Sequence, residues 1–178
     1  MKLKSLTVIM LLTVLLAACG NSGNEDAAPA DNNEPEDIKT LVNDYSTGDY
    51  TDVQASITSE KLVVTDSDEN ETAYDLPDDE FFVSVAPFIN QTHPCFDHSL
   101  TGCQGELVNK DIDVVIEDMD GNVIVDKTMT TPENGFLDFW LPRDETFRVQ
   151  FSHDGKTVES ELSTNEEDGT CVTDLQMT

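Results

Sequence analysis

The chain has few positive charges. Only 9 of its 178 residues are Lys or Arg, against 37 Asp and Glu, which gives a formal net charge of -28. Proteins that bind nucleic acid neutralise its phosphates with clustered Lys and Arg side chains, and this sequence has no such cluster. We therefore expect no nucleic acid partner. The acidity favours solubility and attracts cations to the surface, but it assigns no binding site.

The common catalytic signatures are also missing. The sequence contains no CxxC pair, no glycine-rich phosphate loop and no Ser-His-Asp arrangement that can be ordered along the chain. The lack of CxxC disfavours a thiol-disulfide oxidoreductase, because that spacing tunes the reactivity of a thiol pair. We therefore expect a binding protein without a conventional active site.

Cysteine and histidine are scarce, with four and three residues, but they are unevenly distributed. The stretch from Thr92 to Glu106 contains two of the four cysteines and two of the three histidines. Pro94 and Gly102 interrupt any regular helix or strand there, so the stretch is predicted to be a loop. Thiolate and imidazole are ligands for copper(I) and zinc, whereas calcium and magnesium prefer oxygen. The loop is therefore a candidate site for a soft or borderline metal.

The N-terminus has the order of a bacterial export signal. Basic residues are followed by the apolar run Leu6 to Leu16, which is too short for a spanning helix. The next residues, Leu16-Ala17-Ala18-Cys19, resemble a lipobox, in which the cysteine becomes the lipidated first residue of the mature chain. We predict a lipoprotein signal peptide over residues 1–18. Lipidated Cys19 would anchor the protein to the extracytoplasmic side of the cell membrane.

Two segments precede the main domain. Residues 19–36 lack large apolar side chains and are predicted to be a disordered acidic tether. Residues 37–79 are predicted to be a small helical and hairpin region. Two short helices are expected over 37–57, because apolar residues recur there at roughly helical spacing. Lys61 to Thr65 and Glu71 to Leu76 are expected to form a hairpin.

The remaining residues, 80–178, are predicted to form a β-sandwich domain that binds the metal. They contain seven short runs rich in β-branched and aromatic residues, separated by Asp-Gly and Gly turns. The runs are Phe81 to Ile89, Ile112 to Glu117, Val123 to Met129, Phe136 to Leu141, Phe147 to Ser152, Thr157 to Leu162 and Thr170 to Met177. The fold expected is mainly β with a small helical N-terminal part, an antiparallel sandwich of immunoglobulin-like or transthyretin-like shape.

Three cysteines remain outside the lipobox, and three cannot all pair within one chain. One interpretation is a Cys95–Cys103 disulfide with an idle Cys171. The other is a metal site built from all three thiols. Copper(I) is satisfied by two or three thiolates, and a structural zinc site would be completed by either His93 or His98. Ligand count alone leaves both metals open.

Two stretches carry a family resemblance. His93-Pro94-Cys95 with His98-Ser99-Leu100-Thr101, Cys103 and Gly105-Glu106, together with the later Gly169-Thr170-Cys171-Val172, resemble the CueP family of bacterial envelope copper-binding proteins. The resemblance implies that Cys95, Cys103 and Cys171 are copper ligands. We expect the histidine ligand to be His98 rather than His93.

The family resemblance also implies a function: copper resistance in the cell envelope, reduction of copper(II) to copper(I), and supply of copper to a periplasmic superoxide dismutase. We therefore predict a lipid-anchored protein that sequesters or transfers copper, with at most a cupric-reductase activity. Cys95 and Cys103 are the expected electron source, since a short separation allows them to form a disulfide, and Cys171 would remain a ligand. The alternatives are a non-catalytic surface β-domain with a structural disulfide or zinc site, and a thiol-disulfide oxidoreductase.

Overall fold

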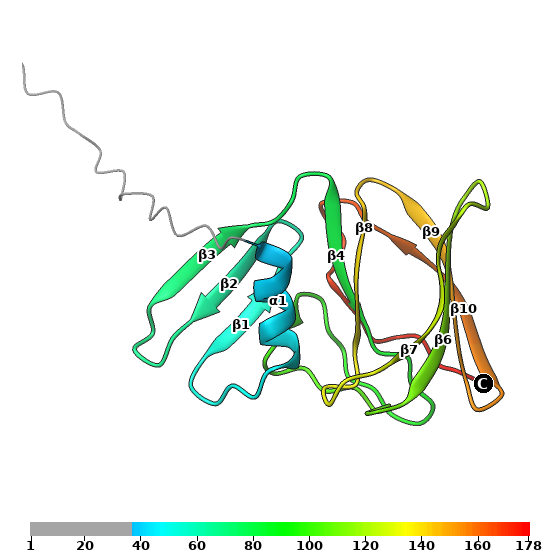
Figure 1. Cartoon of the computed structure of the whole chain (residues 1–178), viewed down its shortest axis with the longest axis horizontal. Coiled ribbons are helices and arrows are strands. Elements are labelled where there is room, and N and C mark those ends of the chain that lie inside the picture. Colours follow the sequence, from blue (N-terminus) through cyan, green and yellow to red (C-terminus); the bar gives the residue numbers. More distant parts are fainter. Residues whose placement is uncertain (1–36) are drawn as a thin grey trace, which may run out of the picture. The chain divides into compact units, whose positions relative to one another are not determined.

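The computed structural model describes residues 37–178. The predicted signal peptide (1–18), the lipidated Cys19 and the tether (19–36) lie outside the described residues. Over residues 37–178, no helix is both long and apolar enough to cross a membrane. The elements in chain order are α1 (Ile38–Thr47), β1 (Gln54–Ile57), β2 (Lys61–Thr65), β3 (Glu71–Asp75), β4 (Glu80–Val85), β5 (His98–Ser99), β6 (Asp111–Asp118), β7 (Val123–Thr130), β8 (Leu137–Pro142), β9 (Thr146–His153), β10 (Lys156–Ser163) and β11 (Cys171–Val172) (Figure 1).

The strands form three sheets. Their orders are β3-β2-β1-β5, β10-β9-β6-β7 and β11-β4-β8. All pairs within them are antiparallel except β11 with β4. The chain is mainly β with one helix, and its antiparallel sheets pack face to face, which confirms the predicted fold class.

The larger apolar core lies between the β10-β9-β6-β7 sheet and one face of the β11-β4-β8 sheet. It follows from strict alternation along the strands, which sends every second side chain inward. Buried members include Phe81, Val83 and Val85 of β4, Ile112, Val114 and Ile116 of β6, Leu137, Phe139 and Leu141 of β8, and Phe147, Val149 and Phe151 of β9. We call this set the sandwich core.

A smaller apolar core lies on the other face of the β11-β4-β8 sheet. It joins α1 to β1 and β2, and its buried members are Val42, Ala55, Ile57, Leu62, Leu76, Phe82 and Leu100. We call this set the helix core. Because Phe81 faces the sandwich core and Phe82 the helix core, β4 is buried on both faces, as its nearly continuous apolar sequence requires. The β11-β4-β8 sheet is therefore shared by both cores.

Residues 37–57 differ from the prediction of two helices. There is one helix, α1, whose N-terminus is capped by the Asp37 carboxylate accepting from the Lys39 N–H at 3.0 Å. The helix ends at Thr47 and is followed by Gly48, where a Cβ would lie 2.6 Å from the Asp44 carbonyl oxygen. The second predicted helix is instead strand β1. Its apolar residues fit a strand better, because Ala55 and Ile57 alternate inward against β2.

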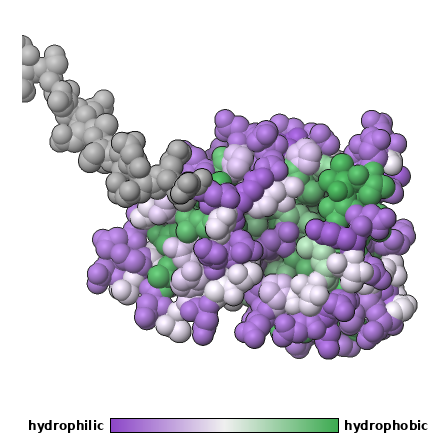
Figure 2. All heavy atoms as spheres, viewed as in Figure 1, coloured by the Kyte–Doolittle hydropathy of each residue, from purple (hydrophilic) through white to green (hydrophobic). Residues whose placement is uncertain are grey.

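The other predicted strands are present, with two shortened. The β2–β3 hairpin and the β6–β7 and β9–β10 hairpins occupy the predicted runs. The first and last sandwich strands, β4 and β11, are shorter than expected. β5 was not predicted, because two residues are too short a run to show a period. On the face shown in Figure 2, hydrophilic side chains predominate, as the net charge requires.

Candidate metal centre

The loop from Thr92 to Glu106 is held against the strands at its middle. β5 pairs with β1, placing His98 opposite Ile57 and Ser99 opposite Ser56. After β5 the chain turns sharply, since the Ser99 carbonyl accepts from the Cys103 N–H at 2.9 Å. The loop therefore has a fixed turn that directs Cys103 back toward His98.

Thr170 ties this turn to the last strand. Its hydroxyl accepts from the His98 N–H at 2.9 Å and donates to the Ile57 carbonyl at 2.6 Å. Thr170 is fully buried, so both bonds form in a low-dielectric environment, where losing either would leave a buried polar group unpaired. The residue after Thr170 is Cys171. The same contact thus positions His98 and Cys171 together.

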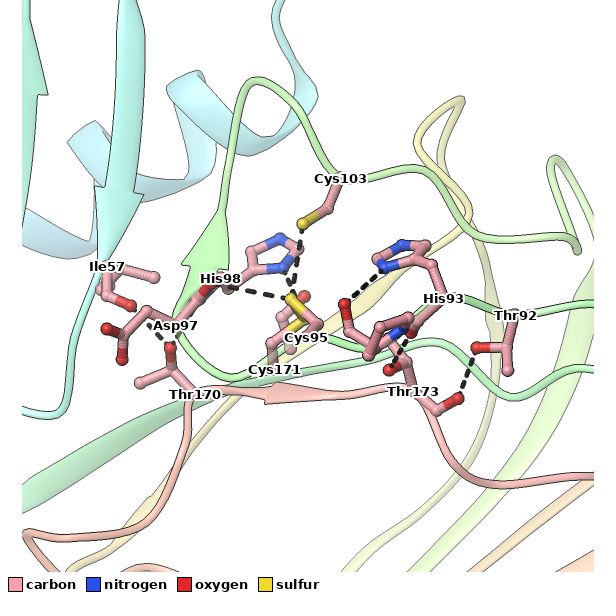
Figure 3. Close-up of a disulfide and its surroundings, with 12 residues drawn as sticks. Ile57, Thr92, His93, Cys95, Asp97, His98, Cys103, Thr170, Cys171 and Thr173 are labelled. Carbon is pink, nitrogen blue, oxygen red and sulfur yellow. Dashed lines mark hydrogen bonds between the residues drawn. A yellow bond between two sulfur atoms is a disulfide. The ribbon is translucent and has the colours of Figure 1, made fainter.

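Cys171 begins β11, which runs parallel to β4 with Cys171 opposite Ser84. On its other side the Cys171 N–H donates to the Phe96 carbonyl at 2.9 Å. This contact brings the neighbouring Cys95 within bonding distance. Cys95 and Cys171 form a disulfide with a Cα–Cα distance of 5.6 Å (Figure 3).

Cys103 is a free thiol beside this disulfide. Its Sγ lies 3.6 Å from the Cys95 Sγ, and its side chain is half-buried. Burial raises the pKa of the Cys103 thiol. The thiol is therefore mostly protonated at neutral pH in the absence of a cation, which makes it a poor nucleophile.

His98 is fully buried on the inner side of the cluster. Its Nδ1 lies 3.4 Å from the Cys171 Sγ, and its ring packs on Phe136 with 4.5 Å between ring centroids. Burial, with a smaller effect from the charge of nearby His93, lowers the pKa of His98 to about 4. The imidazole is neutral near pH 7, the form that binds metals.

The second nitrogen of His98 has no hydrogen-bond partner. Nε2 is the one buried side-chain N or O atom in residues 37–178 without a partner. Buried polar groups are nearly always satisfied, so such an exception needs an explanation. A neutral imidazole with an unpaired nitrogen has a lone pair or an N–H to offer inside the site.

One ligand atom each from Cys95, His98, Cys103 and Cys171 lies within 4.8 Å of the other three. The structure thus brings together all four predicted metal-site residues from two separate segments, the cysteine loop and β11. In the disulfide form, the two bonded sulfurs are weak donors and Cys103 and His98 are the usable ligands. Reduction of the disulfide would provide three thiols and an imidazole, a set that suits copper(I) or zinc.

The expected Cys95–Cys103 disulfide is wrong. Cys95 is bonded to Cys171 instead, although Cys103 is only eight residues away. The pairing is decided by tertiary structure, because the backbone hydrogen bond from the Cys171 N–H to the Phe96 carbonyl aligns the two segments side by side. Closeness in sequence gave the wrong partner.

His93 does not join the cluster. Its Nδ1 lies 3.3 Å from the Pro94 carbonyl, and its own carbonyl accepts from the Thr173 hydroxyl at 2.7 Å. In Figure 3 the His98 ring lies beside the disulfide, whereas the His93 ring is set apart from the sulfur atoms. Choosing His98 over His93 agrees with this geometry.

Sequence reasoning missed the residues that support the site. Asn134 is the main one: its side chain accepts from the Phe136 N–H at 2.9 Å and donates to the Ser46 carbonyl at 2.8 Å, while its carbonyl accepts from the Gly105 N–H at 2.7 Å. Asn134 therefore links the end of α1 to the cysteine loop and to Phe136, on which the His98 ring packs. No spacing pattern in the sequence points to it.

Two more contacts fix the ends of the loop. Gly105 and Gly135 approach so closely that a Cβ on Gly105 would lie 2.5 Å from the Gly135 carbonyl oxygen. The Glu106 carboxylate accepts from the Ile89 N–H at 2.6 Å and from the Asn90 N–H at 2.9 Å. Glu106 thereby clamps the segment that leads into His93 and Cys95.

Comparison with known proteins agrees with this arrangement. The family described as periplasmic copper-binding protein CueP matches residues 37–176. The chain belongs to the CueP family. A crystal structure of S.CueP is similar to this chain at 36% sequence identity and a TM-score of 0.75, covering 80% of this chain and 89% of that one. No curated protein matches the chain. The match to CueP includes the cysteine loop, β11 and every support described above.

Proposed function

We propose that this protein binds copper outside the cytoplasm and sequesters or transfers it, with Cys95, Cys103, Cys171 and His98 as ligands. The observation that carries the proposal is the convergence of these four ligand atoms within 4.8 Å, one of them on a buried imidazole whose other nitrogen is unpartnered. Three thiolates are soft donors and favour copper(I). Membership in CueP supports copper as the metal rather than zinc.

The disulfide gives the proposal a redox component. When Cys95 and Cys171 are both reduced, formation of their Sγ–Sγ bond releases two electrons and two protons. Those electrons convert two copper(II) ions to two copper(I) ions. Cys103 and His98 remain as ligands for the product. The electron pair thus comes from Cys95 and Cys171, and not from Cys95 and Cys103 as the spacing predicted. Repeated turnover needs an external reductant.

Copper(II) reduction and copper(I) binding are tested on the fully reduced protein under anaerobic conditions. A chelating dye measures copper(I), and mass spectrometry maps the disulfide that forms. We expect about two copper(I) per protein from wild type. The Cys95→Ser, Cys171→Ser double variant should lose most of this yield, while His153→Ala, at the end of β9 and outside the cluster, should keep it. Equal yields from wild type and a Cys95→Ser, Cys171→Ser double variant would overturn the assignment.

Measurements of copper(I) affinity distinguish the residues that bind the metal from those that supply the electrons. Competition titrations with copper(I) should show a large loss of affinity for Cys103→Ser and for His98→Asn, because each removes a donor that the disulfide does not use. His93→Ala serves as the matched histidine control. Near-stoichiometric zinc and no copper in protein purified from metal-fed cells would instead support a structural zinc site.

We also propose that Cys19 is lipidated and tethers the domain to the membrane, from which copper would pass to an acceptor such as an envelope superoxide dismutase. The support is the lipobox sequence. Detergent phase partition of the wild type and of Cys19→Ser tests the anchor. We expect the wild type in the detergent phase and the variant in the aqueous phase.

A further inference from the structure

A groove lies beside the disulfide, and His98 is not among the residues that line it. Its volume is about 450 Å³, and both Cys95 and Cys171 line it. Its apolar lining includes Val149, Leu162 and Leu175, which also belong to the sandwich core. The groove therefore opens onto the edge of the sandwich, where the two sheets separate.

One wall of the groove is the free edge of β10. At one end of this strand, the Thr157 N–H and C=O both bond to Thr178, away from β9. Strand residues alternate, so the backbone groups of Glu159, Glu161 and Ser163 point in the same direction. Within residues 37–178, no backbone partner binds these groups of Glu159 or Glu161. An unpaired edge of this kind can accept another strand.

The opposite wall carries an exposed aromatic side chain held by a rigid backbone. Phe96 is 62% exposed, the most exposed of the large apolar residues in residues 37–178. Its carbonyl accepts from the Cys171 N–H, and a Cβ on Gly169 would lie 2.8 Å from the same oxygen. An aromatic ring fixed at the rim of a groove is typical of a binding surface.

The groove is also acidic. Its lining includes Glu161, Asp168 and Asp174 and contains no Lys or Arg. A second copy of this chain, with a formal charge of -28, would be repelled. The chain's own residues 20–36 carry no Lys or Arg and would be repelled as well. The charge favours a cationic occupant.

We propose that this groove binds an extended, Lys- or Arg-bearing segment of a partner protein as an added strand along β10. Alternate side chains of such a segment would face the apolar lining and the acidic rim, and one end would lie beside the Cys95–Cys171 disulfide. The proposal does not depend on copper binding, because the groove is present in the oxidised, copper-free protein. The competing explanation is that Glu159 and Glu161 only protect an edge strand from aggregation.

The test uses a fluorescein-labelled peptide of alternating Lys and Val and the oxidised, copper-free protein. Binding is followed by fluorescence anisotropy, and its position by amide chemical shifts in NMR. We expect saturable binding with shifts at Glu159, Glu161 and Ser163. The same peptide with N-methyl groups on alternate residues keeps its charge but cannot pair as a strand, so its affinity should fall by about tenfold or more. This control requires no change to the protein.

Two protein variants separate specific docking from general attraction. Glu161→Gln removes one charge at the groove, and Asp126→Asn removes one on β7, the opposite edge strand of the same sheet. Only Glu161→Gln should weaken binding. Equal affinities for the methylated and parent peptides, equal weakening by the two variants, or no binding up to about 1 mM peptide would each overturn the proposal.

Discussion

The sandwich core and the helix core are built in different ways. The sandwich core draws most of its residues from strands, with β4, β6, β8 and β9 each contributing alternate side chains. The helix core combines a helix, short strands and three residues from elsewhere: Leu76 after β3, Phe82 of the shared sheet and Leu100 of the cysteine loop. The sandwich core is formed by strands packing on strands, while the helix core joins elements of several kinds.

This difference explains where the metal centre lies. Cys95 and Cys103 pack against a third small cluster, Ala86, Phe136 and Cys171. His98 is held by β1, which belongs to the helix core, and Cys171 is held by β4 of the shared sheet. The site is therefore complete only when both cores have formed. Changes to either core should affect stability, and a change at Phe82, whose ring lies beside His98, should also alter the site.

The largest effect on stability is expected from removing one large buried side chain from each core in turn. Phe147→Ala and Phe82→Ala both delete a fully buried ring, and each should lower the free energy of unfolding by about 3–5 kcal/mol. Urea unfolding followed by circular dichroism measures this loss. The two variants should differ in the rate at which iodoacetamide alkylates Cys103 under native conditions. Only Phe82→Ala should raise it, because Phe82 lies between Trp140 and His98. Equal alkylation rates would contradict the separation of the cores.

The next effect is a loss of stability in acid that originates at His98. Its pKa is about 4 in the folded copper-free protein and near 6.5 when unfolded. Between these values the unfolded state binds more protons, so stability falls as the pH drops from about 6.5 to about 4. The loss from this group is roughly 3 kcal/mol. Urea unfolding of the wild type and of His98→Asn at pH 7.5 and 4.5 should show a smaller acid loss in the variant. Identical losses would show that His98 is not the source.

A smaller effect is expected at the junction between α1 and the shared sheet. The Asp138 carboxylate accepts from the Ser46 and Ser84 hydroxyls, both at 2.5 Å. Asp138→Ala should cost about 1–3 kcal/mol by leaving both donors unpaired, and Asp138→Asn should cost less. Fluorescence of Trp140, which lies beside the helix core, reports the change during urea unfolding.

The contribution of Asp138 to stability depends on pH in the opposite sense to that of His98. Burial raises the pKa of Asp138, with hydrogen bonds from Ser46 and Ser84 opposing the shift. The folded state therefore binds the proton more tightly than the unfolded state. Stability from this group is present below the ordinary carboxyl pKa and is lost as the pH rises through the raised value. Asp138→Asn should remove this loss. If the stability of Asp138→Asn depended on pH as that of the wild type does, Asp138 would not be the source of the loss.

The smallest effects on stability are expected at two similar hairpin tips, one between β2 and β3 and the other between β6 and β7. Asp66 accepts from the N–H groups of Asp68 and Asn70, and Asp118 accepts in the same way from Asp120 and Asn122. Both turns are exposed. Asp66→Ala and Asp118→Ala should each change Tm by only about 2 °C in calorimetry. A much larger shift from one of them would show that its hairpin contributes more than a local turn.

Much of the fold could be predicted because strand alternation is a local property. The hairpins between Ile112 and Met129 and between Phe147 and Leu162 were predicted from alternation and Asp-Gly turns alone. The segment between Asp49 and Ile57 was assigned to a helix because Val53 and Ile57, four apart, fit either period in so short a segment. The segment is a strand because β1 pairs with β2 and β5, and this pairing is visible only in the three-dimensional structure.

The site could be predicted in composition but not in connectivity. The density of Cys and His between Thr92 and Glu106, and the family resemblance of the later Cys171, identified the residues that the structure brings together. Whether Cys95 bonds to Cys103 or Cys171 depends on a tertiary hydrogen bond, from the Cys171 N–H to the Phe96 carbonyl, which leaves no pattern in the sequence. The roles of Thr170 and Asn134 are likewise visible only in three dimensions.

The long span of the disulfide also matters for the order in which the protein is made. Cys95 and Cys103 leave the ribosome before Cys171, which follows Cys95 by 76 residues. In an unfolded chain, closing the 8-residue loop costs about 2 kcal/mol less in entropy than closing the 76-residue one. An oxidant that reaches the chain early will therefore produce the wrong bond first. Correct maturation requires either that oxidation wait for folding or that the early bond be exchanged, so the native bond marks a chain that has already folded.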